Sequence, residues 1–293
     1  PTGSSPPPPV SSCQPMTDVR SGIKKVYKIF GYPEPPTPTP STAEDISKRD
    51  LIRVSEVIFG AVGANPAGIE TVTAPAPLIK INEFTPSIYN NFVYKMDYPS
   101  GYANLSTAIN TASSILQSNP RTGISANSTY YKYIIVITDG LPSAPGESGD
   151  PLCNQDYGLL QDTISNEFRN SCPNARSNTK TAFQNAVADS NACMLILAYG
   201  PNAFTPHNTL NPHLTDYLND SNNNLINHVN AQNPGNCDIE IDIHNKGDIN
   251  SNPALQYIRF ADSATSVGDE LAAIAGLIDD TITSVTLQEI NPQ

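Results

Sequence analysis

One carboxylate follows an apolar run that has the length of a buried strand. Residues 131–140 read Tyr-Lys-Tyr-Ile-Ile-Val-Ile-Thr-Asp-Gly, so Asp139 stands directly after the run. Such a run, without alternation, is typical of a parallel strand covered on both faces. Open α/β sheets place their ligands at the carboxyl ends of their strands, where a carboxylate can hold a cation. Asp139 is therefore a candidate metal ligand; the alternative is that it accepts backbone N–H bonds and orders the loop.

The sequence contains none of the common motifs of catalytic or metal-binding sites. The sequence has no phosphate-binding loop, no Gly-x-Ser-x-Gly and no His-Glu-x-x-His. The histidine spacings fit no zinc pattern, which favours surface positions for His207, His213, His228 and His244. Three acidic residues alternate along an expected strand, where they could attract calcium or mark the solvent face: Asp238, Glu240 and Asp242.

The elements expected around Asp139 alternate between helix and strand. Apolar spacing predicts helices near 43–63, from Leu105 to Leu116, over 179–189 and from Ser266 onward. Apolar runs predict strands at 78–84, 91–96, 131–138, 192–199 and 257–261. This order predicts an α/β fold, with a doubly wound, mostly parallel sheet flanked by helices.

The composition changes along the chain and predicts its division. Residues 1–40 hold 11 of the 27 prolines and are expected to form an extended arm. The globular domain is expected over 41–281, with two long insertions at 141–178 and 201–253. Alternating residues predict a strand or tail leaving the domain at 282–293.

Four segments, taken in order, resemble a von Willebrand factor type A (vWA) domain: 98–116, 131–140, 182–200 and 257–278. The resemblance rests on the strand that ends in Thr-Asp-Gly and on the order of the elements. It implies the Rossmann-like fold of that family and a cation site built from three loops, with Asp139 as the ligand of the third loop.

The first two loops of that cation site depart from the family's pattern. Ala103 stands where the family has a threonine. In the nearest fragment to Asp-x-Ser-x-Ser, residues 17–22, Arg20 and Gly22 take the places of the serines. The resemblance therefore implies a degenerate site. We expect no tightly bound cofactor, and at most weak binding of Mg²⁺ or Ca²⁺.

The cysteines and the glycosylation sequons give further candidate sites. Cys153 and Cys172 flank a polar segment and are expected to form a disulfide, with Cys13 and Cys237 as a second candidate pair. Cys193 lies within an apolar run and is expected to be a buried free thiol. Sequons for glycosylation begin at Asn104, Asn127 and Asn219.

Composition narrows the possible partners. A net charge of −12 argues against nucleic acid, and no run of 18 apolar residues predicts a membrane span. Low charge and the absence of Trp resemble extracellular, cell-surface or virion proteins. The sequence therefore predicts a non-enzymatic, structural or adhesive module of an extracellular, cell-surface, filament or virion assembly, which binds a protein partner or self-assembles. Two alternatives remain: a metal-dependent hydrolase with a cleft at Asp139, and a vWA adhesin whose cation site is completed by other ligands.

Overall fold

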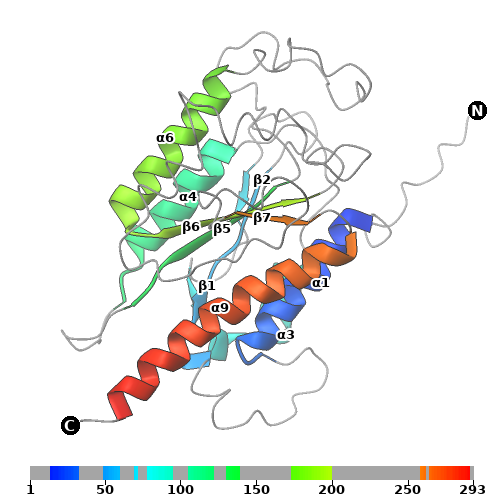
Figure 1. Ribbon diagram of the computed structural model, residues 1–293, viewed down its shortest axis with the longest axis vertical. Coiled ribbons are helices and arrows are strands. Elements are labelled where there is room, and N and C mark those ends of the chain that lie inside the picture. Colours follow the sequence, from blue (N-terminus) through cyan, green and yellow to red (C-terminus); the bar gives the residue numbers. More distant parts are fainter. Residues whose placement is uncertain are drawn as a thin grey trace, which may run out of the picture.

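The computed structural model describes residues 14–32, 49–59, 69–71, 78–94, 105–121, 130–138, 173–199, 258–261 and 264–290 (Figure 1). Within these ranges helices combine with two small antiparallel strand pairs and one parallel sheet. In chain order the elements are α1 (Gln14–Ile29), β1 (Arg53–Val54), β2 (Val57–Phe59), β3 (Ile69–Thr71), β4 (Ile79–Lys80), the 3-10 helix η2 (Ile81–Glu83), α3 (Pro86–Tyr94), α4 (Leu105–Ser118), β5 (Tyr133–Thr138), α6 (Pro173–Ser190), β6 (Cys193–Tyr199), β7 (Ile258–Ala261) and α9 (Ala264–Ile290).

The parallel sheet has the order β5-β6-β7. It confirms the strands expected at 131–138, 192–199 and 257–261. β6 lies between its two neighbours and is buried throughout residues 193–197, because it is covered on both faces. In β5 buried and half-buried residues alternate instead. The sequence predicted that residues 131–138 would be buried on both faces of the strand. β5 is fully buried on one face only, and the strand that is buried on both faces is β6.

Two helix pairs lie on opposite sides of this sheet (Figure 1). One pair is α4 with α6, and it confirms the helices expected from Leu105 and over 179–189. The other pair is α1 with α9, which also contacts β6 and β7. α6 ends at Ser190, and the next residue, Asn191, has a φ of 53° in the left-handed region, a common way to end a helix. The chain then enters β6.

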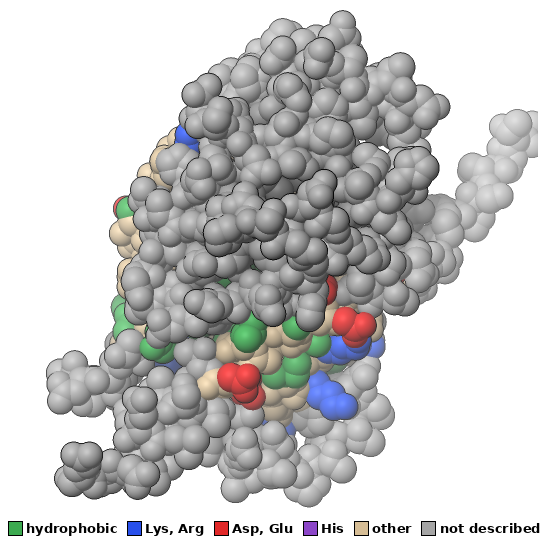
Figure 2. Space-filling view, in the orientation of Figure 1, with side chains coloured by type: hydrophobic (Ala, Val, Ile, Leu, Met, Phe, Trp, Pro, Cys, Tyr) green, Lys and Arg blue, Asp and Glu red, His purple; other side chains and the backbone are tan. Residues whose placement is uncertain are grey.

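The contact between α1 and α9 runs through two glycines. A Cβ placed on Gly22 would lie 2.5 Å from Leu271 Cδ1 and 3.0 Å from the Cα of Gly268. Glycine at position 22 therefore allows the two helix backbones to approach closely. Beside this contact, Lys25 Nζ lies 2.7 Å from Asp269 Oδ1. Figure 2 shows basic and acidic side chains flanking hydrophobic ones on this face of the molecule.

Helix α1 corrects the expectation of an extended arm over residues 1–40. Residues 14–29 form a helix that packs against α9 and α3. All the prolines of the arm except Pro15 lie before residue 10 or after residue 32. The count over 40 residues therefore concealed the proline-poor segment between these two groups. That segment has apolar residues at helical spacing, with Val19, Tyr27 and Phe30 buried.

Two further elements, the helix expected near 43–63 and the strand expected at 91–96, were predicted wrongly. The helix expected near 43–63 is replaced beyond residue 51 by β1 and β2, which pair antiparallel with β4 and β3. The helical spacing there was fortuitous, because β-branched residues such as Val54 and Val57 favour strands. The strand expected at 91–96 is helical as far as Tyr94, within α3. Pro86 opens this helix, and Thr85 Oγ1 accepts a hydrogen bond from the Ile88 amide at 3.2 Å, which caps it.

The strands expected at 78–84 and 282–293 also differ from the structure. The strand expected at 78–84 is confined to Ile79–Lys80, after which the chain forms η2. The strand or tail expected at 282–293 is wrong for 282–290, because α9 continues to Ile290. Apolar residues at 278, 282 and 285 keep the helical spacing that alternation within this segment obscured.

Cys193 differs from its expected state as a free thiol. It is buried at the start of β6 and is disulfide-bonded. The other four cysteines, including the expected pair Cys153 and Cys172, lie outside the described residues.

Of the helices that the structure describes, none combines the length and apolar character that a membrane span requires.

Candidate functional site

The carboxyl ends of the three parallel strands lie together at one edge of the sheet. Thr138, the last residue of β5, pairs with Ala198 of β6, and Tyr199 pairs with Ala261 of β7. Thr138 is buried. Asp139 follows directly and lies outside the described residues, so its role as a metal ligand or loop cap stays a prediction.

The residues proposed for the first loop of a cation site do not fit that role. Residues 17–22 belong to α1, and a helix cannot direct side chains at i, i+2 and i+4 to one ion as a loop can. Arg20, at the first serine position, is buried and brings a positive charge. In the part of the chain that the structure describes, no three His, Cys, Asp or Glu side chains form a group able to hold a metal.

Helices α4 and α6 lie together on one side of the sheet (Figure 1). Side chains of the two helices line an open groove. Its volume is about 270 Å³. Two of its lining residues come from the first turns of α4 and four from the middle of α6: Ser106, Asn110, Asn178, Thr181, Ala182 and Asn185. The two helices are thus brought together to present amide and hydroxyl groups along one surface.

Local sequence explains how α6 presents its polar face. Asn178, Thr181 and Asn185 follow one another at spacings of three and four, so they share one face of the helix and are exposed. Thr179, Ala182 and Ala186 are buried beside them. The end of α6 is tied to the start of β5, because Lys132 Nζ donates a hydrogen bond of 2.8 Å to the carbonyl of Ser190.

The groove is suited to hydrogen-bonded recognition. None of its six lining residues is ionisable, so its charge does not change with pH. An asparagine amide carries two donor hydrogens and an acceptor oxygen, and a hydroxyl can donate or accept. These groups match a partner with exposed backbone amides, side-chain amides or hydroxyls.

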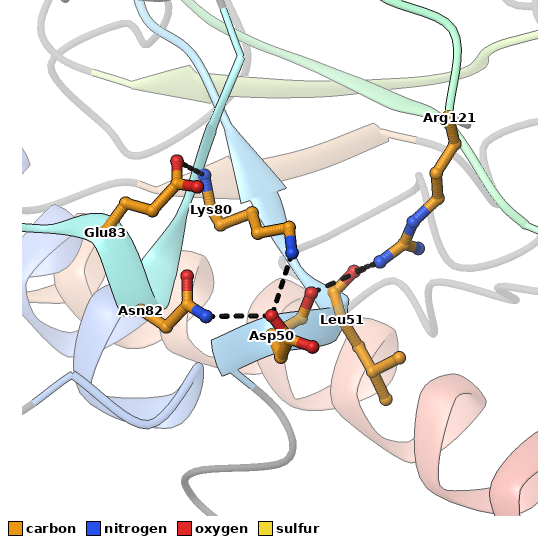
Figure 3. A network of polar contacts seen from close by, with 6 residues as sticks. All are labelled: Asp50, Leu51, Lys80, Asn82, Glu83 and Arg121. Atoms are coloured by element: carbon orange, nitrogen blue, oxygen red, sulfur yellow. Dashed lines mark hydrogen bonds and ion pairs between the residues drawn. The ribbon is translucent and has the colours of Figure 1, made fainter. Parts of the chain in front are cut away.

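A second polar cluster holds the strand pair β1–β4 to the end of α4 (Figure 3). Asp50 Oδ1 accepts hydrogen bonds from Lys80 Nζ at 2.9 Å and from Asn82 Nδ2 at 2.8 Å. The bond from Lys80 lowers the pKa of the Asp50 carboxyl. Arg121, three residues after α4, donates to the carbonyls of residues 50 and 51. These bonds join residues 50 and 51 to β4, to η2 and to the end of α4, so we assign the cluster the role of positioning β1 and β4.

The groove consists of residues that the sequence analysis did not single out, and the predicted site residues are not tested. The other predicted sites lie outside the described residues, namely His207, His213, His228 and His244, the acidic strand at 238–242, and the sequons at Asn104, Asn127 and Asn219. The groove was missed, although the spacing of Asn178, Thr181 and Asn185 was a signal for a polar helix face.

Comparisons with known proteins give one structural likeness. No protein-family model matches the chain, and no curated protein sequence matches it. Among solved structures, the chain is similar to the pilus adhesin SpaC from Lactobacillus rhamnosus GG in its open conformation, with a TM-score of 0.53 and 15% identity. The likeness covers 91% of this chain and 28% of the adhesin chain. At this identity the likeness shows the fold alone.

Proposed function

We propose that this chain is a non-enzymatic adhesive or structural module of an extracellular or cell-surface assembly, and that it binds another protein. The observation that carries the proposal is the fold likeness to a pilus adhesin over 91% of the chain. The chain spans little more than a quarter of that adhesin, so the proposal concerns a module rather than the activity of a whole adhesin.

The same proposal includes a doubly wound, vWA-like arrangement of the domain. A parallel β5-β6-β7 sheet between two helix pairs fits such an arrangement. We also propose that the cation site is degenerate, because the segment at 17–22 lies in a helix. Without a cation to hold a partner, recognition falls to other surfaces, and the uncharged groove between α4 and α6 is the surface we assign to it.

The function can be tested with the complete chain immobilised on a biosensor. Purified extracellular matrix proteins, intact cells and a second copy of the chain are the analytes, with and without EDTA. The proposal predicts saturable binding of at least one analyte that EDTA does not remove. Absence of binding to all of them, or turnover of esterase or phosphatase substrates that Asp139→Ala abolishes, would contradict it.

A further inference from the structure

Aromatic rings pack around one tyrosine of α1. Tyr27 makes edge-to-face contacts with Phe84, which lies between η2 and α3, and with two rings of α3, at centroid distances of 5.3 Å to Phe84, 5.9 Å to Tyr89 and 6.1 Å to Phe92. Tyr27 is only 3% exposed. Such a cluster is a poor environment for charge, because its rings offer little to replace water around an ion.

One carboxyl group enters this environment from the segment between β1 and β2. Tyr27 donates a hydrogen bond of 2.8 Å to Glu56 Oε1. The second oxygen of Glu56, Oε2, is buried and has no hydrogen-bond partner. A protonated carboxyl group can occupy this position, whereas a carboxylate would leave a buried charge with a single hydrogen bond.

Among the residues that the structure describes, no positive charge compensates Glu56. Tyr27 of α1 and its neighbour Tyr89 of α3 carry phenol groups, which bear no positive charge. Arg53, from the neighbouring strand β1, donates instead to the carbonyl of Asn119 at 3.0 Å. Arg49 donates to the carbonyl of Gly31 and lies over a different ring. Burial accordingly raises the pKa of Glu56 to about 8, with the bond from Tyr27 acting in the opposite direction.

We propose that Glu56 and Tyr27 form a pH-sensitive latch that holds α1 against the segment joining β1 and β2. The latch is closed while Glu56 carries its proton and loosens when Glu56 ionises. The docked state binds the proton more tightly than the undocked state, in which Glu56 regains its ordinary pKa. Docking is therefore strongest at low pH, weakens as pH rises from about 4.5, and changes no further above about 8.

Hydrogen exchange of the α1 amides tests the latch in the complete chain. Protection factors are measured between pH 5 and 9 and corrected for the intrinsic exchange rate. In the wild type we expect protection of α1 to fall with pH, approaching about tenfold per unit up to pH 8. In Glu56→Gln, which cannot ionise, the same amides should show no such fall. Amides of α4 report global unfolding and serve as the internal control.

A second variant gives an independent test. Because the Tyr27 hydroxyl lowers the pKa of Glu56, Tyr27→Phe should extend the loss of α1 protection to higher pH. A flat wild-type profile, or a fall in Glu56→Gln as steep as in the wild type, would overturn the latch. So would an equal and parallel fall in α1 and α4, because Glu56 would then act on global stability alone.

Discussion

The two helix pairs that cover the sheet are built from different residues. In α1–α9 the backbones approach at Gly22 and Gly268, and no room remains at Gly22 for a larger side chain. α4 and α6 are also in contact and carry buried alanines, and exposed asparagines of both helices line an open groove. The close packing of α1 against α9 fixes the position of these helices, and the two glycines at the contact carry no hydrogen-bonding side chains. The groove between α4 and α6, in contrast, is lined by amide and hydroxyl groups. We therefore propose a structural role for the α1–α9 pair and a role in partner recognition for the groove of the α4–α6 pair.

The largest expected effect comes from filling the contact between α1 and α9. Gly22→Val would place carbon atoms where Leu271 and the Gly268 backbone already lie. We expect the free energy of unfolding to fall by about 3 kcal/mol, the upper range for overpacking. Urea unfolding followed by circular dichroism measures this loss.

A second glycine of α9 provides the matched control for Gly22→Val. A Cβ on Gly276 meets nothing within 4 Å. Gly276→Ala should therefore raise the free energy of unfolding by about 0.5–1 kcal/mol, because alanine is the better helix former. Equal losses in the two variants would show that the close contact at Gly22 is not what holds the helices together.

The ion pair beside the glycines should matter much less. The side chains of Lys25 and Asp269 are 45% and 75% exposed, so water screens their attraction. We expect Lys25→Met to lower the free energy of unfolding by less than about 1 kcal/mol, with the difference from wild type shrinking further at high salt. Thermal unfolding at two salt concentrations measures both. A loss as large as that of Gly22→Val would reverse the ranking of the two contacts.

Local patterns in the sequence accounted for some elements and not for others. The runs that became β5 and β6 and the spacing in α4 and α6 are continuous over many residues, so neighbours along the chain suffice to identify them. α1 was obscured by the prolines on either side, and β1 and β4 are too short to carry a period. The groove joins Asn110 to Asn185, and no local pattern tells which faces of two distant helices will meet. The burial of Glu56 likewise depends on Tyr27 and on the aromatic residues of α3.

The measurement that tests the recognition surface most directly compares two double variants in partner binding. Asn110→Ala with Asn185→Ala removes two amides from the groove, and Asn90→Ala with Asn91→Ala removes two exposed amides from α3. Each lost hydrogen bond should cost about 1 kcal/mol, so the groove variant should raise Kd about 25-fold, with unfolding free energy within about 0.5 kcal/mol of wild type. The α3 variant should bind as wild type does. Unchanged Kd in the groove variant, or an equal loss in both, would contradict the assignment of recognition to the α4–α6 groove.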